Sequence, residues 1–141
     1  MEPLHRLCAA LLCALASQAC VAGDIALPAP QVQGAVSFVT GGIGSDEASA
    51  FRAAAPQYNL RLTLAAVSGE FIAGVRVTLR DAKGATLVEA TSDGPYVFFN
   101  VPPGRYLVIA DNMGQVVSRN AVVHAGRGTE LYLRWKTQPE Q

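Results

Sequence analysis

The chain has 141 residues, of which half are hydrophobic and 16% are charged, with 11 basic and 11 acidic side chains. This length suits one domain plus a short leader, and the composition is typical of a folded protein rather than a disordered one. With a net charge of zero, the chain lacks the basic excess that nucleic-acid binding requires, so we predict no nucleic-acid partner.

The first 22 residues have the features of a cleaved secretory signal peptide. A weakly basic start at His5 and Arg6 is followed by an apolar run at 7–16, and Cys20-Val21-Ala22 supplies a small-residue cleavage signature. The apolar run is about half the ~20 residues that a membrane span needs, so we predict no transmembrane span. The protein is therefore expected to be exported and to be periplasmic or secreted.

The cysteines of the chain, Cys8, Cys13 and Cys20, all lie in this leader. An exported protein can form disulfides, but the remaining domain has no cysteine, so its stability is expected to come from packing. Cys20 raises the alternative of a lipid anchor. Ser17 stands where a lipoprotein signal requires an aliphatic residue, which favours the soluble form.

The rest of the chain divides into an arm, a domain and a tail. Residues 23–34, which include Pro28 and Pro30, are expected to form an extended N-terminal arm. Residues 35–136 are expected to form the folded domain, and residues 137–141 a frayed tail. We therefore expect a single folded unit between two short segments.

A short helix is predicted near the start of the domain, at about residues 45–55. Ser45 offers a hydroxyl cap, two acidic residues complement the helix dipole in the first turn, and Pro56 ends the helix. Its apolar stripe, centred on Phe51, is expected to dock on the sheets. The glycine-rich loop at 41–44 has the composition of a phosphate cradle, but the two acids would repel an anion, so we expect a flexible hinge.

From Tyr58 onward, apolar and polar residues alternate with a period of two, which is typical of half-buried strands. Strands are predicted at 60–66, 75–80, 86–91, 96–101, 106–110, 115–123 and 129–135, with a further short strand at 35–40. Turn signals separate these segments at intervals of about 8–12 residues. The pattern predicts an all-β fold, an antiparallel, Greek-key-like sandwich of about seven strands with one short N-terminal helix.

Three successive runs of strand and turn residues are the most specific feature of the chain. A V-x-V-x-L-x-D-x-x-G run begins at Val75, a T-x-D-G-x-Y-x-F run at Thr91 and a V-P-P-G-x-Y-x-V run at Val101. In the third run, Pro103 presets φ for the second position of a type II turn, and Gly104 can adopt the positive φ needed at the third. We therefore predict a type II turn between two strands.

Together these runs resemble the carboxypeptidase regulatory-like domains, which belong to the prealbumin-like and collagen-adhesin B-type sandwiches. The resemblance extends over about residues 60–123. In metallocarboxypeptidases this sandwich is appended to the catalytic domain and does not cut peptides, so the resemblance implies a protein that is not an enzyme and has no cofactor. It implies a binding or assembly module for a protein partner in the cell envelope, with a carbohydrate-binding module as the alternative.

An unrecognised hydrolase of transthyretin-like fold is the remaining alternative. The catalytic residues that such a hydrolase needs are largely missing. His124 is the one histidine outside the leader, and the sequence offers no carboxylate close to it as a partner for a general base. Transthyretin-related hydrolases resemble one another in two histidines, an arginine and a C-terminal Tyr-Arg-Gly-Ser, whereas this chain ends in Trp-Lys-Thr-Gln-Pro-Glu-Gln. We therefore predict no catalytic residues.

The last strand offers the best candidate for a binding surface. Alternation directs Leu131, Leu133 and Trp135 toward the core. It directs Tyr132 and Arg134 toward solvent, and we expect these two side chains to form the surface that contacts a partner. Edge strands offer a second route to binding, by addition of a partner strand.

Asp81, Asp93 and Asp111 each precede a glycine in a turn. If the three turns gathered at one end of the sandwich, their carboxylates could hold calcium through oxygen ligands. Aspartate and glycine also serve such turns for local reasons. We therefore assign no metal site and keep these aspartates as weak calcium candidates.

Overall fold

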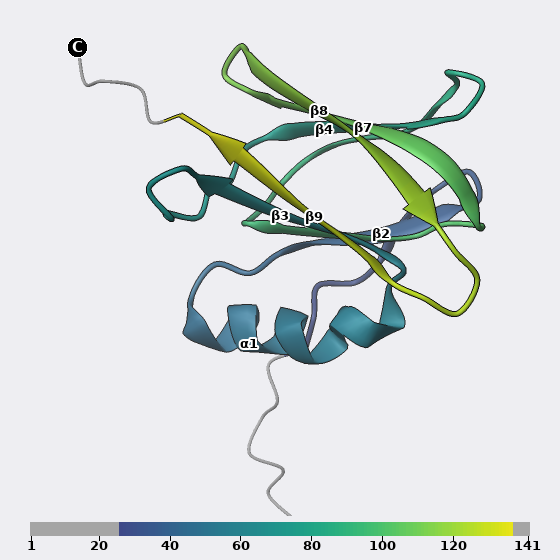
Figure 1. Ribbon diagram of the computed structural model, residues 1–141. Coiled ribbons are helices and arrows are strands. Elements are labelled where there is room, and N and C mark those ends of the chain that lie inside the picture. Colours follow the sequence, from purple (N-terminus) through teal and green to yellow (C-terminus); the bar gives the residue numbers. More distant parts are fainter. Residues whose placement is uncertain (1–25, 137–141) are drawn as a thin grey trace, which may run out of the picture.

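The computed structural model describes residues 26–136 (Figure 1). The predicted signal peptide, Cys20 and the tail at 137–141 lie outside the described residues. Within the described range, no helix combines the length and the apolar character needed to cross a bilayer.

In the described part of the chain, nine strands form two sheets that pack face to face (Figure 1). Sheet A has the order β1-β2-β6-β3-β9, with β1 at Gln31–Gln33, β2 at Val36–Gly41, β6 at Tyr96–Asn100, β3 at Leu60–Ala66 and β9 at Thr129–Trp135. Sheet B has the order β5-β4-β7-β8, with β5 at Thr86–Thr91, β4 at Arg76–Asp81, β7 at Gly104–Asn112 and β8 at Gln115–Val123. Helix α1 spans Ser45–Ala54 and continues into a 3-10 turn, η1, at Ala55–Gln57. The predicted all-β sandwich with one N-terminal helix is confirmed.

Two features of the sheets differ from the prediction. The segment expected as an extended arm contributes β1, which pairs with β2 in a hairpin turning at 34–35. In addition, β3 and β9 run parallel, with Leu60 opposite Thr129 and Ala66 opposite Trp135. Alternation reports which face of a strand is buried but not the direction of its neighbour, because parallel and antiparallel strands share a period of two.

The main core lies between the two sheets. Inward side chains of β3 at Leu60, Leu62 and Leu64 meet those of sheet B, among them Leu79 and Val108, and all of these are fully buried. Burial of side chains of this size stabilises a fold by about 1.5–3 kcal/mol each. The leucine alternation seen in the sequence is therefore the inner face of sheet A.

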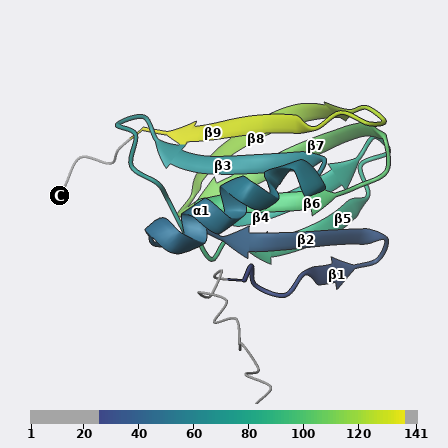
Figure 2. The same ribbon diagram turned by 90° about the horizontal axis from the view of Figure 1, so that it is seen from below.

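Helix α1 covers part of the outer face of sheet A (Figure 2). Phe51 is fully buried there, with its ring 5.4 Å from Phe98 in an edge-on contact and 5.7 Å from Tyr96 in a stacked one. Val39, Ala48 and Tyr58 are the other buried members of this second cluster. The predicted docking stripe centred on Phe51 is thus the face that joins the helix to the sheet.

The prediction for the start of α1 is wrong in two respects. The N-cap is Gly44, with φ of 86°, and Ser45 is the first helical residue rather than the cap. The loop before the helix is not a hinge, because a Cβ on Gly42 would overlap the Tyr96 ring, and the amide of Gly42 donates to Glu47 Oε1 at 2.7 Å. The loop is a packed connection whose amide already has a carboxylate partner.

The predicted type II turn at Pro103-Gly104 is also wrong. Gly104 has φ of 158°, nearly extended and far from the value of about +80° that this turn requires, and it is the first residue of β7. The chain turns instead at a corner where the Tyr106 hydroxyl donates to the carbonyl oxygen of Pro102. The corner is therefore stabilised by a side-chain hydrogen bond and not by a glycine with positive φ.

Candidate functional site

Part of the outer face of sheet A is left open by α1. The helix packs over β2 and β6, and Figure 2 shows β9 on the far side of β3 from it. In this uncovered part, the register of the parallel pair places Thr63 opposite Tyr132 and Ala65 opposite Arg134. Residues directly opposite each other point to the same face of a sheet, so these four lie together on the outer face.

Tyr132 and Arg134 have the orientations that alternation predicts. Tyr132 is 58% exposed and Arg134 is also exposed, whereas Leu133 and Trp135 are buried. Leu131 is partly buried and packs against the main core. The phenol and the guanidinium therefore both reach solvent from a strand whose other face is anchored in the core.

Phe71 extends this surface, although strand alternation does not predict its position there. It lies in the loop between β3 and β4, forms an isolated antiparallel bridge with Ala65, and places its ring 6.0 Å from that of Tyr96. Its side chain is nevertheless 59% exposed. The sequence signal that could have indicated an exposed aromatic residue here is a single phenylalanine directly after a Ser-Gly-Glu turn. We call Thr63, Ala65, Phe71, Tyr132 and Arg134 the β3–β9 patch.

The three aspartates considered for calcium are not brought together. The pairing of β4 with β7 places Asp81 opposite Tyr106 near one end of β7, and Asp111 opposite Arg76 near the other. Five residue steps along β7, from Tyr106 to Asp111, separate the backbone positions of the two aspartates by about 17 Å at 3.4 Å per residue. In the described part of the chain, no three His, Cys, Asp or Glu side chains are grouped so that they could hold a metal ion.

Local hydrogen bonds account for two of these aspartates. Asp81 Oδ1 accepts from the amides of Lys83 and Ala85 at 2.9 and 3.0 Å, and Asp111 Oδ1 accepts from the amide of Gly114 at 2.7 Å. Carboxylates of this kind stabilise hairpin turns by taking the place of a backbone acceptor. These side chains thus serve the two hairpins of sheet B.

His124 lies in the β8–β9 loop, beside a cleft of about 330 Å³. The cleft is lined by Pro56, Gln57, Tyr58, Asn59, Asn100, Pro103, His124, Ala125, Gly126, Arg127 and Gly128. This set includes no carboxylate, serine, threonine or cysteine. The carboxylate partner that would make His124 a general base is therefore not among the residues that line the cleft.

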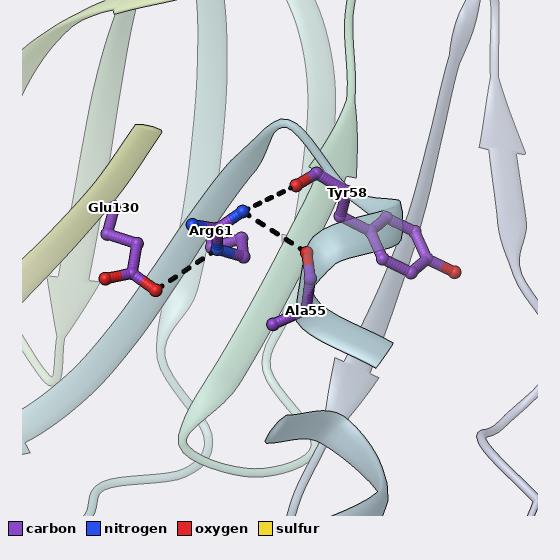
Figure 3. Close-up of polar contacts among 4 residues, drawn as sticks. All are labelled: Ala55, Tyr58, Arg61 and Glu130. Carbon is purple, nitrogen blue, oxygen red and sulfur yellow. Dashed lines mark hydrogen bonds and ion pairs between the residues drawn. The ribbon is translucent and has the colours of Figure 1, made fainter. Parts of the chain in front are cut away.

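Arg61 joins the helix to the sheet beside this cleft (Figure 3). Its Nη1 donates to the carbonyl oxygens of Ala55 and Tyr58 at 3.2 and 2.9 Å, and its Nε pairs with Glu130 Oε1 at 3.2 Å. The carbonyl groups at the end of a helix need donors of this kind. Arg61 therefore has a structural role that its place in an alternating strand did not reveal.

The fold and the patch define a small β-sandwich with one face partly covered by a helix and partly open. No family model matches the sequence, and no curated protein matches it. Among solved structures, the chain is similar to the 5-hydroxyisourate hydrolase of Klebsiella pneumoniae, with a TM-score of 0.45 and 18% sequence identity, covering 57% of this chain and 85% of that one. The resemblance to carboxypeptidase regulatory-like domains stays a prediction.

Proposed function

We propose that this protein is an exported, non-catalytic binding module that engages a protein partner through the β3–β9 patch. The observation that supports this most is the exposure of Phe71 and Tyr132, at 59% and 58%, beside Arg134 on the uncovered part of sheet A. Aromatic side chains and arginine contribute most of the binding energy in protein interfaces.

The position of the patch on the sheet favours binding over a purely solvated surface. Ala65 lies between Phe71 and Arg134, and Thr63 lies between Tyr96 and Tyr132, so β3 joins the exposed aromatic and basic side chains into one surface. The strands that carry this surface are anchored by fully buried leucines. A rigid platform loses little conformational entropy when a partner binds, which favours affinity.

Site-specific crosslinking tests this proposal. A photoreactive phenylalanine analogue replaces Tyr132 in one variant and Thr78, on the outer face of sheet B, in another. We expect the Tyr132 position to crosslink one protein from an envelope extract and the Thr78 position to crosslink none. Mass spectrometry then identifies the partner, and binding is measured with the two purified proteins.

The purified pair allows a quantitative check. Tyr132→Ala and Arg134→Ala are each expected to weaken binding by about tenfold or more, because both remove groups of the hot-spot type. Thr78→Ala is the control and should leave the affinity unchanged. Equal affinity in all three variants would show that the β3–β9 patch does not bind the partner. Competition by free oligosaccharides would indicate that the patch binds a carbohydrate instead.

Export is tested separately from binding. The sequence of residues 1–22 supports cleavage by a signal peptidase, either after Ala22 or after Ala19. The mass of the protein purified from its native compartment should match one of these cleaved forms. A mass increase from lipid on Cys20 would support the anchored form instead, and an intact N-terminus would contradict export.

A further inference from the structure

A second site, distinct from the β3–β9 patch, lies at the end of the sandwich where the β8–β9 loop approaches η1. The cleft there is formed by three separate segments: the η1–β3 junction at 56–59, the corner at Asn100 and Pro103, and the loop at 124–128. Figure 1 shows this loop at the same end of the molecule as the C-terminal end of α1. The cleft is thus assembled by tertiary structure from segments far apart in the sequence.

The loop presents two basic side chains side by side. The backbone amide of Arg127 donates to the carbonyl oxygen of His124 at 3.4 Å, and this bond closes a four-residue turn. Gly126 occupies the third position of the turn and has a φ of 73°. His124 and Arg127 are partners in an antiparallel bridge. Partners in such a bridge point to the same face, with Cβ atoms about 5 Å apart, so the imidazole and the guanidinium leave the loop together.

This arrangement is suited to an anion. Arginine is a donor only, and the imidazole offers an N–H donor in either protonation state. No carboxylate is among the lining residues that could already accept from these donors. Glu130, two residues beyond the loop, is already paired with Arg61. An anion between His124 and Arg127 would therefore receive hydrogen bonds from both.

Arg61 fixes the η1 wall of the cleft and contacts the base of the loop opposite it. Arg61 bonds to the carbonyls of Ala55 and Tyr58 on one wall and to Glu130 beside the other (Figure 3). Gly128 packs directly on the Arg61 guanidinium, where a Cβ would overlap it. A site that needs little rearrangement gives a ligand more of its interaction energy as affinity.

We infer that this cleft binds a carboxylate, held between Arg127 and His124. Arginine matches the planar geometry of a carboxylate through paired N–H donors, and the imidazole supplies a further bond. Gln57, Asn100 and Pro103 line the space available to the rest of the ligand. A volume of about 330 Å³ suits a small organic acid or the C-terminal residue of a peptide. The inference is independent of the partner-binding function proposed above.

Nuclear magnetic resonance titration of the isotope-labelled protein tests this inference. The probes are succinate, the tripeptide Ala-Ala-Ala with a free carboxylate, and the same tripeptide amidated at its C-terminus. We expect saturable shifts of the backbone amides at 124–128 with a Kd of about 1 mM or below for at least one carboxylate.

Arg127→Gln and His124→Gln should each weaken binding by about tenfold, as expected for a lost bond to a charged group. Arg119→Gln on β8, also an exposed arginine, is the matched control.

The probes distinguish the two sources of a carboxylate. Saturation by the free tripeptide alone supports a peptide C-terminus, and saturation by succinate supports a small acid. Equal binding of the amidated tripeptide would overturn carboxylate recognition. So would the absence of saturation up to about 10 mM with both acids, or an unchanged Kd in both variants that keep the wild-type melting temperature.

Discussion

Single side chains complete the backbone hydrogen bonding of this protein where the strand ladders stop. Asn59 bonds to Val101 in both directions, with Nδ2 donating to the carbonyl at 2.6 Å and Oδ1 accepting from the amide at 3.0 Å. The Ser92 hydroxyl oxygen likewise accepts a hydrogen bond from the backbone amide of Val75, at 3.0 Å. Each such bond contributes about 1 kcal/mol, and a buried backbone group left without it costs about 1–3 kcal/mol.

Tyr106 is expected to make the stability of the protein sensitive to alkaline pH. Burial, and secondly the charge of Asp81, raise the pKa of its hydroxyl above the usual 10.0. Because the folded state holds this proton more tightly than the unfolded state, the contribution to the free energy of unfolding is complete below about pH 10 and declines as the pH rises further.

Tyr106→Phe separates this effect from simple loss of the hydrogen bond to Pro102. The variant should be less stable by about 1 kcal/mol at about pH 8, and its free energy of unfolding should fall less between about pH 8 and about pH 11 than that of the wild type. Urea denaturation at both pH values measures this. Parallel declines in the two proteins would show that Tyr106 does not carry the alkaline dependence.

Helix α1 depends on its contact with sheet A. At ten residues it is shorter than the ~12–15 residues at which isolated helices become even marginally stable in water. Its N-cap is a glycine without a side-chain cap. Phe51, which stacks on Tyr96 and meets Phe98 edge-on, therefore provides much of the free energy that keeps the segment helical.

Phe51→Ala should lower the free energy of unfolding by about 3–5 kcal/mol, the usual range when a buried phenylalanine is truncated. Arg52→Ala, at the exposed neighbouring position, should change it by no more than about 0.5 kcal/mol. Urea denaturation measures both variants, and far-ultraviolet circular dichroism reports whether helix is lost first. A cost below about 1 kcal/mol for Phe51→Ala would mean that the helix is held by other contacts.

At the scale of the whole molecule, both open sides of the sandwich are joined by side chains. On one side, Trp135 Nε1 donates to the carbonyl of Gln115 at 2.9 Å, and Thr129 Oγ1 donates to the carbonyl of Val122 at 2.8 Å, which ties β9 to β8. On the other, the Gln33 amide pairs with both backbone groups of Glu89 at 3.0 and 3.1 Å, which ties β1 to the edge of β5. Edge strands left without such cover are sites of aggregation.

Gln33→Ala should uncover the edge of β5. We expect the amide of Glu89 to exchange with solvent faster, and aggregation at a matched protein concentration to begin sooner, because the ladder edge loses its partner. Hydrogen exchange and light scattering measure the two effects. Gln31→Ala, at an exposed position of the same strand, is the control. Unchanged exchange at Glu89 would contradict a role for Gln33 as edge cover.

Much of the architecture could be predicted from local patterns. The alternation of Leu60, Leu62 and Leu64 predicts the inner face of β3, and the spacing around Phe51 predicts the docking face of the helix. Alternation likewise orients Tyr132 outward and Trp135 inward. These features are predictable because side-chain direction repeats every two residues in a strand and about every 3.6 in a helix.

Other features depend on contacts between distant segments. Phe71 joins the β3–β9 patch, and His124 meets the η1 wall of its cleft, through contacts between segments far apart in the chain. The parallel pairing of β3 with β9 is equally invisible to a local pattern. Which faces are buried follows from the order of the amino acids alone, because burial follows hydrophobicity at a fixed period. Which segments became neighbours depended on how the two sheets and the helix packed, since a local pattern carries no information about distant partners.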